Sequence, residues 1–187
     1  MRSVSAAIRN ERATTQTNPF QANEDPAVRG GFPLNPGDRG GSHNLVIGTG
    51  NRFTRAALGG LVAGELNTIS NIETSVAGGG NNIASGGIAS VLGGVSNRAS
   101  GFETIISGGG GNTSSGTWDS ILGGFENTTS RDFSSVSGGV LNTASGQYSS
   151  VSGGQNNSVS GTGTVVIGGL NIIDNNDNSI APKVPYP

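Results

Sequence analysis

The chain has 187 residues, of which 34 are glycine, and only 32% are hydrophobic, 5% aromatic and 12% charged. A formal net charge of −2 and the absence of cysteine argue against a nucleic-acid-binding surface, a disulfide framework and a thiolate metal site. Disordered chains of such low hydrophobicity usually carry high charge and much proline, which this one lacks, so the composition favours an internal repeat.

Residues 1–40 show no period and contain four prolines and several charges. Arg9, Glu11 and Arg12 interrupt any apolar stretch at the start, so we do not expect a signal peptide there. We predict an irregular N-terminal lead or cap, because an open coil end would otherwise expose unpaired backbone groups. No apolar run reaches about 18 residues, so we expect no membrane span.

The segment 41–175 is the predicted repeat domain, in which an asparagine recurs at nearly constant spacing, with a longer first interval and a shorter last one. A branched aliphatic residue lies six positions before each asparagine, and the clearest copy is SSVSGGVLNTASGQY at 134–148. The asparagines are Asn51, Asn67, Asn82, Asn97, Asn112, Asn127, Asn142, Asn157 and Asn171. The aliphatic residues are Leu45, Leu61, Val76, Val91, Ile106, Ile121, Val136, Val151 and Val165.

A period of this length is too short for helical pairs or propeller blades, and it predicts a coil of two short strands and two tight turns. In the copy at 134–148, Val136 and Ala144 are expected to point inward, while Gly138 and Gly139 make a turn. Parallel, in-register stacking would place equal side chains above one another, so that asparagine amides hydrogen-bond in a ladder. The predicted fold is an all-β parallel solenoid of about nine coils, with a structural ladder formed by Asn82, Asn97, Asn112, Asn127, Asn142 and Asn157.

One such coil buries little apolar surface, since its clear inward groups are one valine and one alanine. Their burial is small beside the conformational entropy lost in ordering a whole coil. We therefore expect matching copies of the chain to pack together as a small symmetric homo-oligomer. The pattern itself does not determine the number of copies.

Beyond Ile173 the sequence changes to DNNDNS and ends in a proline-rich segment, so residues 176–187 are predicted to form a tail or tip. Asp174, Asp177 and the asparagines between them resemble a loose cation loop, but they lack EF-hand spacing. We expect no metal site and no cofactor.

Catalytic chemistry requires groups that converge on a pocket. His43 is the only histidine, and the acidic residues of the repeat are scattered without the paired carboxylates of a glycosidase. We therefore expect no enzymatic activity. The acidic residues of the repeat considered for such a pair are Glu73, Glu103, Asp119, Glu126 and Asp132.

Large aromatic residues interrupt the background of small side chains at related turn positions. They would either pack between chains or over turns, or form a stripe that binds a glycan or protein partner. The candidate ligand-binding residues are Phe102, Trp118, Phe133 and Tyr148.

Repeats of the form SSVSGG-x-x-NTASG-x-x resemble the head domains of trimeric autotransporter (YadA-like) adhesins, whose unit is S-V-A-I-G…A-x-A-S-G. The resemblance covers about 41–175. Its Ile-Gly form is kept at 45–48 and 165–168, while the coils from Val76 to Val151 carry glycine in place of that isoleucine. It implies a left-handed parallel β-roll of three chains, exposed outside the cell or on its surface. Similar rolls also occur in phage and predatory-bacterial fibres.

The function implied is an adhesive and structural head module of a homotrimeric fibre, which binds a host- or prey-cell surface glycan or protein by multivalent weak contacts. Neither nucleic acid nor membrane insertion of this segment is expected. One alternative is an ice- or surface-binding solenoid, since Thr113, Thr128 and Thr143 align, although their neighbours Ile83, Arg98 and Ser158 break the column. Another is a non-catalytic receptor-binding domain of a tail fibre. A polysaccharide-degrading tailspike is disfavoured because an acid cluster is missing.

Overall fold

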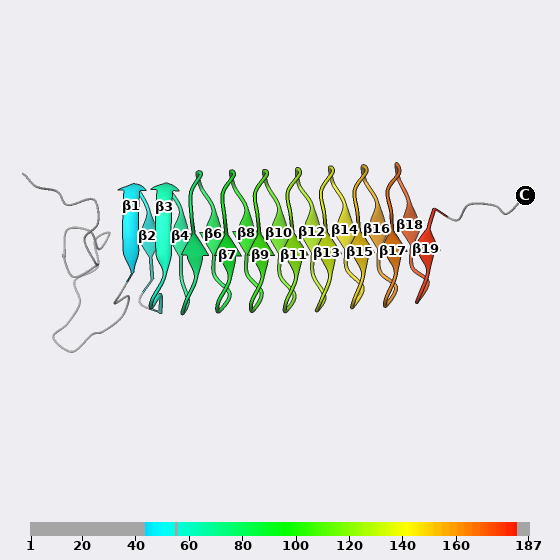
Figure 1. Cartoon of the computed structure of the whole chain (residues 1–187), viewed down its shortest axis with the longest axis horizontal. Coiled ribbons are helices and arrows are strands. Elements are labelled where there is room, and N and C mark those ends of the chain that lie inside the picture. Colours follow the sequence, from blue (N-terminus) through cyan, green and yellow to red (C-terminus); the bar gives the residue numbers. More distant parts are fainter. Residues whose placement is uncertain (1–43, 55, 183–187) are drawn as a thin grey trace, which may run out of the picture.

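A computed structural model describes residues 44–54 and 56–182, which form one thin solenoid of stacked coils (Figure 1). All regular secondary structure in these residues is β-strand, and most strands are two residues long. The predicted lead at 1–40 lies outside the described residues. Within 44–54 and 56–182, no helix has the length and apolar character needed to cross a lipid bilayer.

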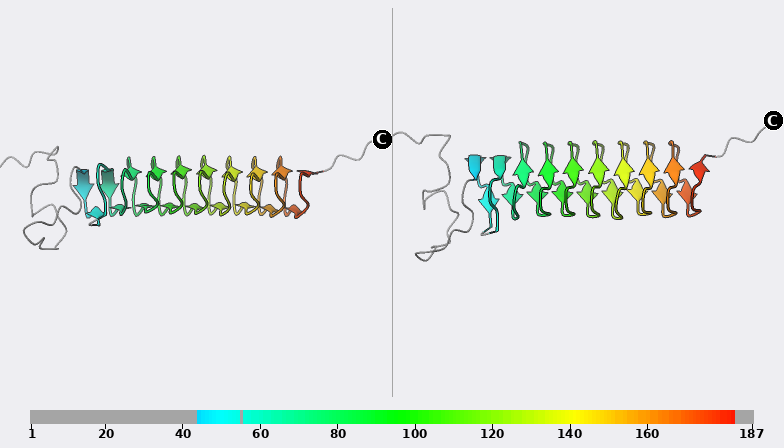
Figure 2. Two further views of the ribbon diagram at one scale, coloured as in Figure 1. Left: turned by 90° about the horizontal axis from the view of Figure 1, so that it is seen from below. Right: turned by 60° about the horizontal axis from the view of Figure 1, so that its bottom comes forward.

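Two parallel sheets run along the solenoid, one of ten strands and one of nine (Figure 2). Each strand pairs in register with the equivalent strand of the next coil, as Val136 does with Val151. The prediction of an all-β parallel solenoid of about nine coils is therefore confirmed. Sheet A contains β1 (Leu45–Thr49), β3 (Leu61–Glu65), β5 (Ser75–Val76), β7 (Ser90–Val91), β9 (Ile105–Ile106), β11 (Ser120–Ile121), β13 (Ser135–Val136), β15 (Ser150–Val151), β17 (Val165–Val166) and β19 (Ile180–Ala181). Sheet B contains β2 (Arg52–Phe53), β4 (Thr68–Ile69), β6 (Ile83–Ala84), β8 (Arg98–Ala99), β10 (Thr113–Ser114), β12 (Thr128–Thr129), β14 (Thr143–Ala144), β16 (Ser158–Val159) and β18 (Ile173–Asp174).

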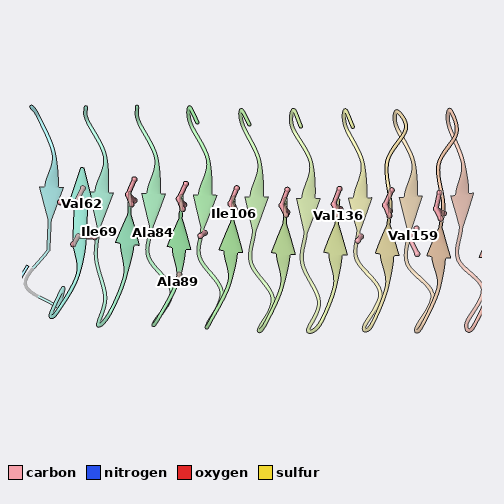
Figure 3. Packing of buried hydrophobic residues seen from close by; sticks show 14 of the residues in the cluster. Val62, Ile69, Ala84, Ala89, Ile106, Val136 and Val159 are labelled. Atoms are coloured by element: carbon pink, nitrogen blue, oxygen red, sulfur yellow. The ribbon is translucent and has the colours of Figure 1, made fainter. Parts of the chain in front are cut away.

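The core is a narrow double column between the sheets, made by the second residue of each short strand (Figure 3). Val136 and Ala144 are both buried, as expected from the repeat. Sheet B contributes less apolar surface to the core than sheet A, since its inward positions include Ser114 and Thr129, whose hydroxyls hydrogen-bond to each other at 3.0 Å. In sheet A the buried column is Val62, Val76, Val91, Ile106, Ile121, Val136, Val151 and Val166.

The inward position differs from the prediction in three coils, those whose strands begin at Leu45, Leu61 and Val165. Leu61 and Val165 were expected in the core, but they pair with the outward Ser75 and Ser150. Their neighbours Val62 and Val166 are buried instead. Successive strand residues face opposite sides, so a shift of one position exchanges core and surface. Leu45 is displaced in the same way, because it pairs with Leu61.

In the coils from Val76 to Val151, the glycine two positions after the core aliphatic residue is an added residue and does not replace an isoleucine of the core. Five positions separate Val46 from Asn51, whereas six separate Val76 from Asn82. A Cβ built on Gly78 would meet no atom within 4 Å, so this residue bulges outward. The departure from the Ile-Gly form therefore leaves the core column intact.

The solenoid extends past residue 175. Ile180 and Ala181 form β19, which pairs with β17, so the segment predicted as a tail at 176–187 begins with part of a coil. Residues 183–187 lie outside the described residues.

Candidate functional site: two edges of the solenoid

The two turns of each coil form two edges that run along the solenoid. The turn from sheet A to the ladder asparagine makes the edge that we call the glycine edge. The turn from sheet B back to sheet A makes the aromatic edge. The glycine edge consists of residues 77–81, 92–96, 107–111, 122–126, 137–141, 152–156 and 167–171, and the aromatic edge of 71–74, 86–89, 101–104, 116–119, 131–134, 146–149, 161–164 and 176–179.

Beneath the glycine edge lies a column of buried asparagines. The Asn127 Nδ2 donates to the carbonyls of Gly123 and Gly139, at 3.0 Å each, and its Oδ1 accepts from the backbone N–H of Asn142 at 3.0 Å. The ladder thus links each side chain to backbone groups, whereas the sequence suggested amide-to-amide contacts. The same pattern is repeated at Asn82, Asn97, Asn112, Asn142 and Asn157, with the N–H of the next coil as donor to each Oδ1.

The ladder ends one residue away from the position expected from the sequence. The backbone N–H of Ile172 donates to Asn157 Oδ1 at 2.9 Å, so Ile172 occupies the next position in the column. Asn171 lies instead in an exposed column, next to Asn156. The Nδ2 of Asn156 donates to the Oδ1 of Asn171 at 2.7 Å. The shorter interval from Asn157 to Asn171 in the sequence reflects this offset.

Close packing between coils makes one glycine of the glycine edge obligatory. Gly139 has a φ of 87°, and a Cβ there would lie 2.2 Å from the Gly154 carbonyl oxygen and 2.6 Å from Asn142 Nδ2. Real Cβ atoms do not approach backbone so closely, and β-carbon strain at positive φ adds to the cost. The chain can therefore bring the ladder amide onto the backbone of the next coil only where this side chain is missing.

The outer surface of the glycine edge is nearly uncharged. Residues 77–80 and their six equivalents contain no Asp, Glu, Lys or Arg, and Glu126 is the one charged residue at the fifth position of these turns. Large apolar side chains are exposed on four of its seven turns, at 92–96, 122–126, 137–141 and 167–171, and the turns at 77–81, 107–111 and 152–156 carry none. These residues are Leu92, Val95, Leu122, Phe125, Val140, Leu141, Ile167 and Leu170.

The aromatic edge brings three of the four predicted ligand-binding residues into one column. The ring centroids of Trp118 and Phe133 are 4.9 Å apart, and those of Phe133 and Tyr148 are 5.0 Å apart, with interplanar angles of 25° and 14°. Phe102 lies in a neighbouring column. The residue equivalent to Trp118 in the preceding coil is Glu103, and Phe102 comes one position before it. Its ring lies over Gly87, where a Cβ would be 3.1 Å from Phe102 Cδ2.

The three stacked residues sit in backbone conformations that side chains rarely adopt. Trp118, Phe133 and Tyr148 have φ values of 56°, 62° and 57°. A left-handed conformation costs a non-glycine residue roughly 1–2 kcal/mol. Offset stacking of each ring pair contributes about 0.5–1.5 kcal/mol in the opposite direction. Every residue of this column from Glu73 to Asn178 has a positive φ, so the conformation belongs to the repeat, and three successive coils carry rings in it.

The ends of this column differ. At one end the Trp118 Nε1–H donates to Glu103 Oε2 at 2.6 Å. At the other end the residue after Tyr148 in the column is Gly163, with a φ of 64°, and Asn178 follows it. One end is therefore closed by a carboxylate and the other lacks a side chain in the adjacent row.

A buried carboxyl group lies beneath the aromatic edge at Asp119, which the sequence placed among the scattered acids. Its Oδ2 accepts from the Gly116 N–H at 2.8 Å, and its Oδ1 accepts from the N–H and Oγ of Ser134 at 2.9 and 3.0 Å. Burial raises the pKa of Asp119, while hydrogen bonds to Ser134, Gly116 and Thr129 oppose that increase. Strand alternation would have indicated its burial, since it lies two residues before the inward Ile121.

The structure groups no metal-binding cluster in the part of the chain that it describes. No set of three or more His, Cys, Asp or Glu residues converges there. His43 lies outside the described residues. Asp174 is buried and accepts from Asn176 and Ser179 within its own coil.

The threonine column of the alternative surface-binding hypothesis lies on sheet B. Thr113 pairs with Thr128, which pairs with Thr143, so the three are adjacent. Arg98 precedes them and Ser158 follows them in the same column. The regular threonine array is therefore three coils long.

Comparison of the sequence with protein-family models and with curated proteins finds no match to either. The resemblance to trimeric autotransporter heads thus depends on the repeat motif alone.

Proposed function

We propose that this chain is an adhesive and structural head module of a homotrimeric fibre, displayed on a cell surface or outside the cell. In this proposal each chain is a left-handed β-roll, and it has no catalytic role. The fibre binds a cell-surface glycan or protein through the aromatic edge. The observation that carries the proposal is the contrast between a nearly uncharged glycine edge with exposed aliphatic side chains and a charged edge that presents aligned rings.

The glycine edge supports association with further copies of the same chain. Its large apolar side chains lie on four of the seven turns, and a second copy of the chain presents them at the same positions along the solenoid. A three-fold axis parallel to the solenoid would place the same edge of all three copies at the centre, which closes the assembly. Burial of Leu122, Phe125 and their equivalents would supply the apolar contacts that the thin core lacks.

The aromatic edge would then face outward in three copies. Weak contacts at each copy combine into strong attachment when the sites are linked and can engage together. A solenoid with identical coils suits this role, because it holds the sites at fixed spacing. A fibre module of this kind needs no pocket or cofactor.

Oligomeric mass in solution tests the proposal. We expect sedimentation equilibrium to give three times the 18.6 kDa of one chain. A double variant of the glycine edge, Leu122→Glu with Phe125→Glu, should lower the mass, because it places charge at two exposed apolar positions. Phe133→Glu on the aromatic edge is the matched control and should leave the mass unchanged. A stable folded monomer of the unaltered chain would contradict the proposal.

Adhesion is measured separately by binding of fluorescently labelled protein to whole cells. The trimer should bind, and the dissociated glycine-edge variant should bind at least about tenfold more weakly because avidity is lost. A thermal-hysteresis assay distinguishes the alternative of an ice-binding surface, which predicts activity that depends on Thr128. Hysteresis without cell binding would favour that alternative over adhesion.

A further inference from the structure

The ring of Tyr148 has one face that no side chain of the column covers. Phe133 is stacked on both faces, by Trp118 and by Tyr148, and is 42% exposed, whereas Tyr148 is stacked on one face and is 55% exposed. The row beyond Tyr148 holds Gly163. The stack of rings therefore ends in an open aromatic face directed along the solenoid.

Because Gly163 has no side chain, the column has a gap in the one coil between Tyr148 and Asn178. Coils are about 4.8 Å apart, so the rows of Tyr148 and Asn178 are separated by roughly 9–10 Å. The Asn178 side chain leans toward the gap, since its Oδ1 is 2.8 Å from the place of a Gly163 Cβ. The space beside Tyr148 is thus bounded by its ring on one side and by the Asn178 amide on the other. Because that amide reaches over Gly163, a ligand ring can insert only when the exposed Asn178 side chain turns outward.

Polar groups flank this gap. Gln147 precedes Tyr148 and is exposed, and the exposed Asp177 accepts from the Thr162 N–H at 2.7 Å through Oδ1. These groups and Asn178 offer both donors and acceptors for hydrogen bonds. A flat apolar face bordered by such groups matches a ligand ring that has apolar C–H faces and hydroxyls around its edge.

The charge of the aromatic edge narrows the class of ligand. Its exposed charged side chains are four acids, Glu73, Glu103, Asp132 and Asp177, and one base, Arg131. Such an edge repels polyanions, including nucleic acids and sulfated or sialylated glycans. An uncharged ligand avoids this repulsion.

We propose that the gap between Tyr148 and Asn178 at Gly163 is a subsite for one pyranose ring of an uncharged carbohydrate chain. The C–H face of the sugar stacks on Tyr148, and its hydroxyls hydrogen-bond with Gln147, Asp177 and Asn178. This assignment rests on the proposed adhesive function, for which it names the ligand class.

A glycan array that carries neutral and acidic glycans tests the subsite with the full chain. The unaltered protein should bind neutral glycans. Gly163→Phe should fill the gap by extending the stack and reduce that binding by about tenfold or more. Its ring is tolerable there, since Tyr148 has a similar φ and Asn178 is exposed and able to move. Tyr148→Ala should reduce the binding to a similar degree.

Ile88→Phe is the matched control, because it adds a ring in the same column at a φ of 60°, five rows before Gly163. It should leave glycan binding unchanged. Thermal melting of each variant verifies that the solenoid is folded. The proposal is overturned if the array shows no neutral hits, if only acidic glycans bind, or if Gly163→Phe binds as well as the unaltered chain.

The outcomes separate this inference from the adhesive function. A trimer that binds cells through a protein, with no neutral glycan bound, would leave the proposed function standing and remove the subsite. Neutral glycan binding by a monomer, lost in Gly163→Phe, would support the subsite and remove the fibre.

Discussion

The two edges of the solenoid are built from the same repeat and both contain residues at positive φ, yet only the glycine edge has a positive-φ position with no room for a side chain. On the glycine edge, Gly139 cannot carry a side chain because its Cβ would lie 2.2 Å from the next coil. On the aromatic edge, Phe133 has a φ of 62° and carries a ring that is 42% exposed. The space outside the backbone, more than φ alone, decides whether glycine is required.

The edges differ also in what lies beneath them. Amide side chains such as Asn127 tie the glycine edge to the next coil, and small hydroxyl residues or Asp119 lie under the aromatic edge. The glycine edge is therefore held by a continuous ladder of side-chain hydrogen bonds from Asn82 to Asn157, whereas the aromatic edge has backbone hydrogen bonds along its length and ring stacking in only three of the described coils. Substitutions at the two edges should have distinct consequences.

Removing one rung of the asparagine ladder should have the largest effect. Asn112→Ala leaves the N–H of Asn127 and the carbonyls of Gly108 and Gly124 without their side-chain partner. We expect the free energy of unfolding to fall by about 3–6 kcal/mol in urea denaturation at fixed protein concentration. Thr113→Ala, at the adjacent outward position, should cost less than about 1 kcal/mol. Equal losses for the two variants would show that the ladder is not the main support of this edge.

Alanine at one glycine of each edge tests the role of space directly. Gly139→Ala should lower the free energy of unfolding by about 2–5 kcal/mol, since strain at positive φ adds to overpacking. Gly163→Ala should cost only about 1–2 kcal/mol, because its Cβ meets the movable Asn178 side chain. Thermal or chemical denaturation of both variants measures the difference. If the costs were the same, φ alone would explain the glycines.

Loss of the central ring should weaken the aromatic edge moderately. Phe133→Ala removes two stacking contacts, for an expected loss of about 1–3 kcal/mol in the free energy of unfolding. Trp118 fluorescence should change as well, because it is the only tryptophan and loses its neighbour. Phe102→Ala serves as the control, since its ring is outside the stack, and it should leave the emission of Trp118 unaltered.

The smallest effect concerns Asp119 and depends on pH. Because burial raises its pKa in the folded chain, the fold favours the protonated carboxyl group. Stability from this group is present below the pKa of the unfolded chain and is lost as the pH rises through the folded pKa. Asp119→Thr should thus gain roughly 1 kcal/mol relative to the unaltered chain near neutral pH and less in acid. A difference that stays constant with pH would show that ionisation of Asp119 does not matter.

Much of the architecture follows from the sequence because its signal is a strict period. The asparagines from Asn82 to Asn157 recur at equal spacing, and a parallel stack is the arrangement that gives all of them the same surroundings. The inward Val136 and Ala144 followed from strand alternation. The aromatic residues were also recognised as outliers, since little else in the repeat is large.

Other features depended on the neighbouring coil and needed the tertiary structure. Both residues are aliphatic in Leu61–Val62 and in Val165–Val166, so the sequence does not show which of the two points inward. The pairing of Leu61 with Ser75 and of Val165 with Ser150 places Leu61 and Val165 on the outer face. The backbone partners of each asparagine became defined only when the coils were stacked.

The sequence by itself determined the period, the fold class and the ladder column, because each depends on residues at fixed spacing along one chain. The tertiary structure decided which rings stack, that Asp119 is buried, and that Gly163 leaves a face of Tyr148 open. These depend on the side chain present one coil away and on its direction, which the regular spacing of the repeat does not convey.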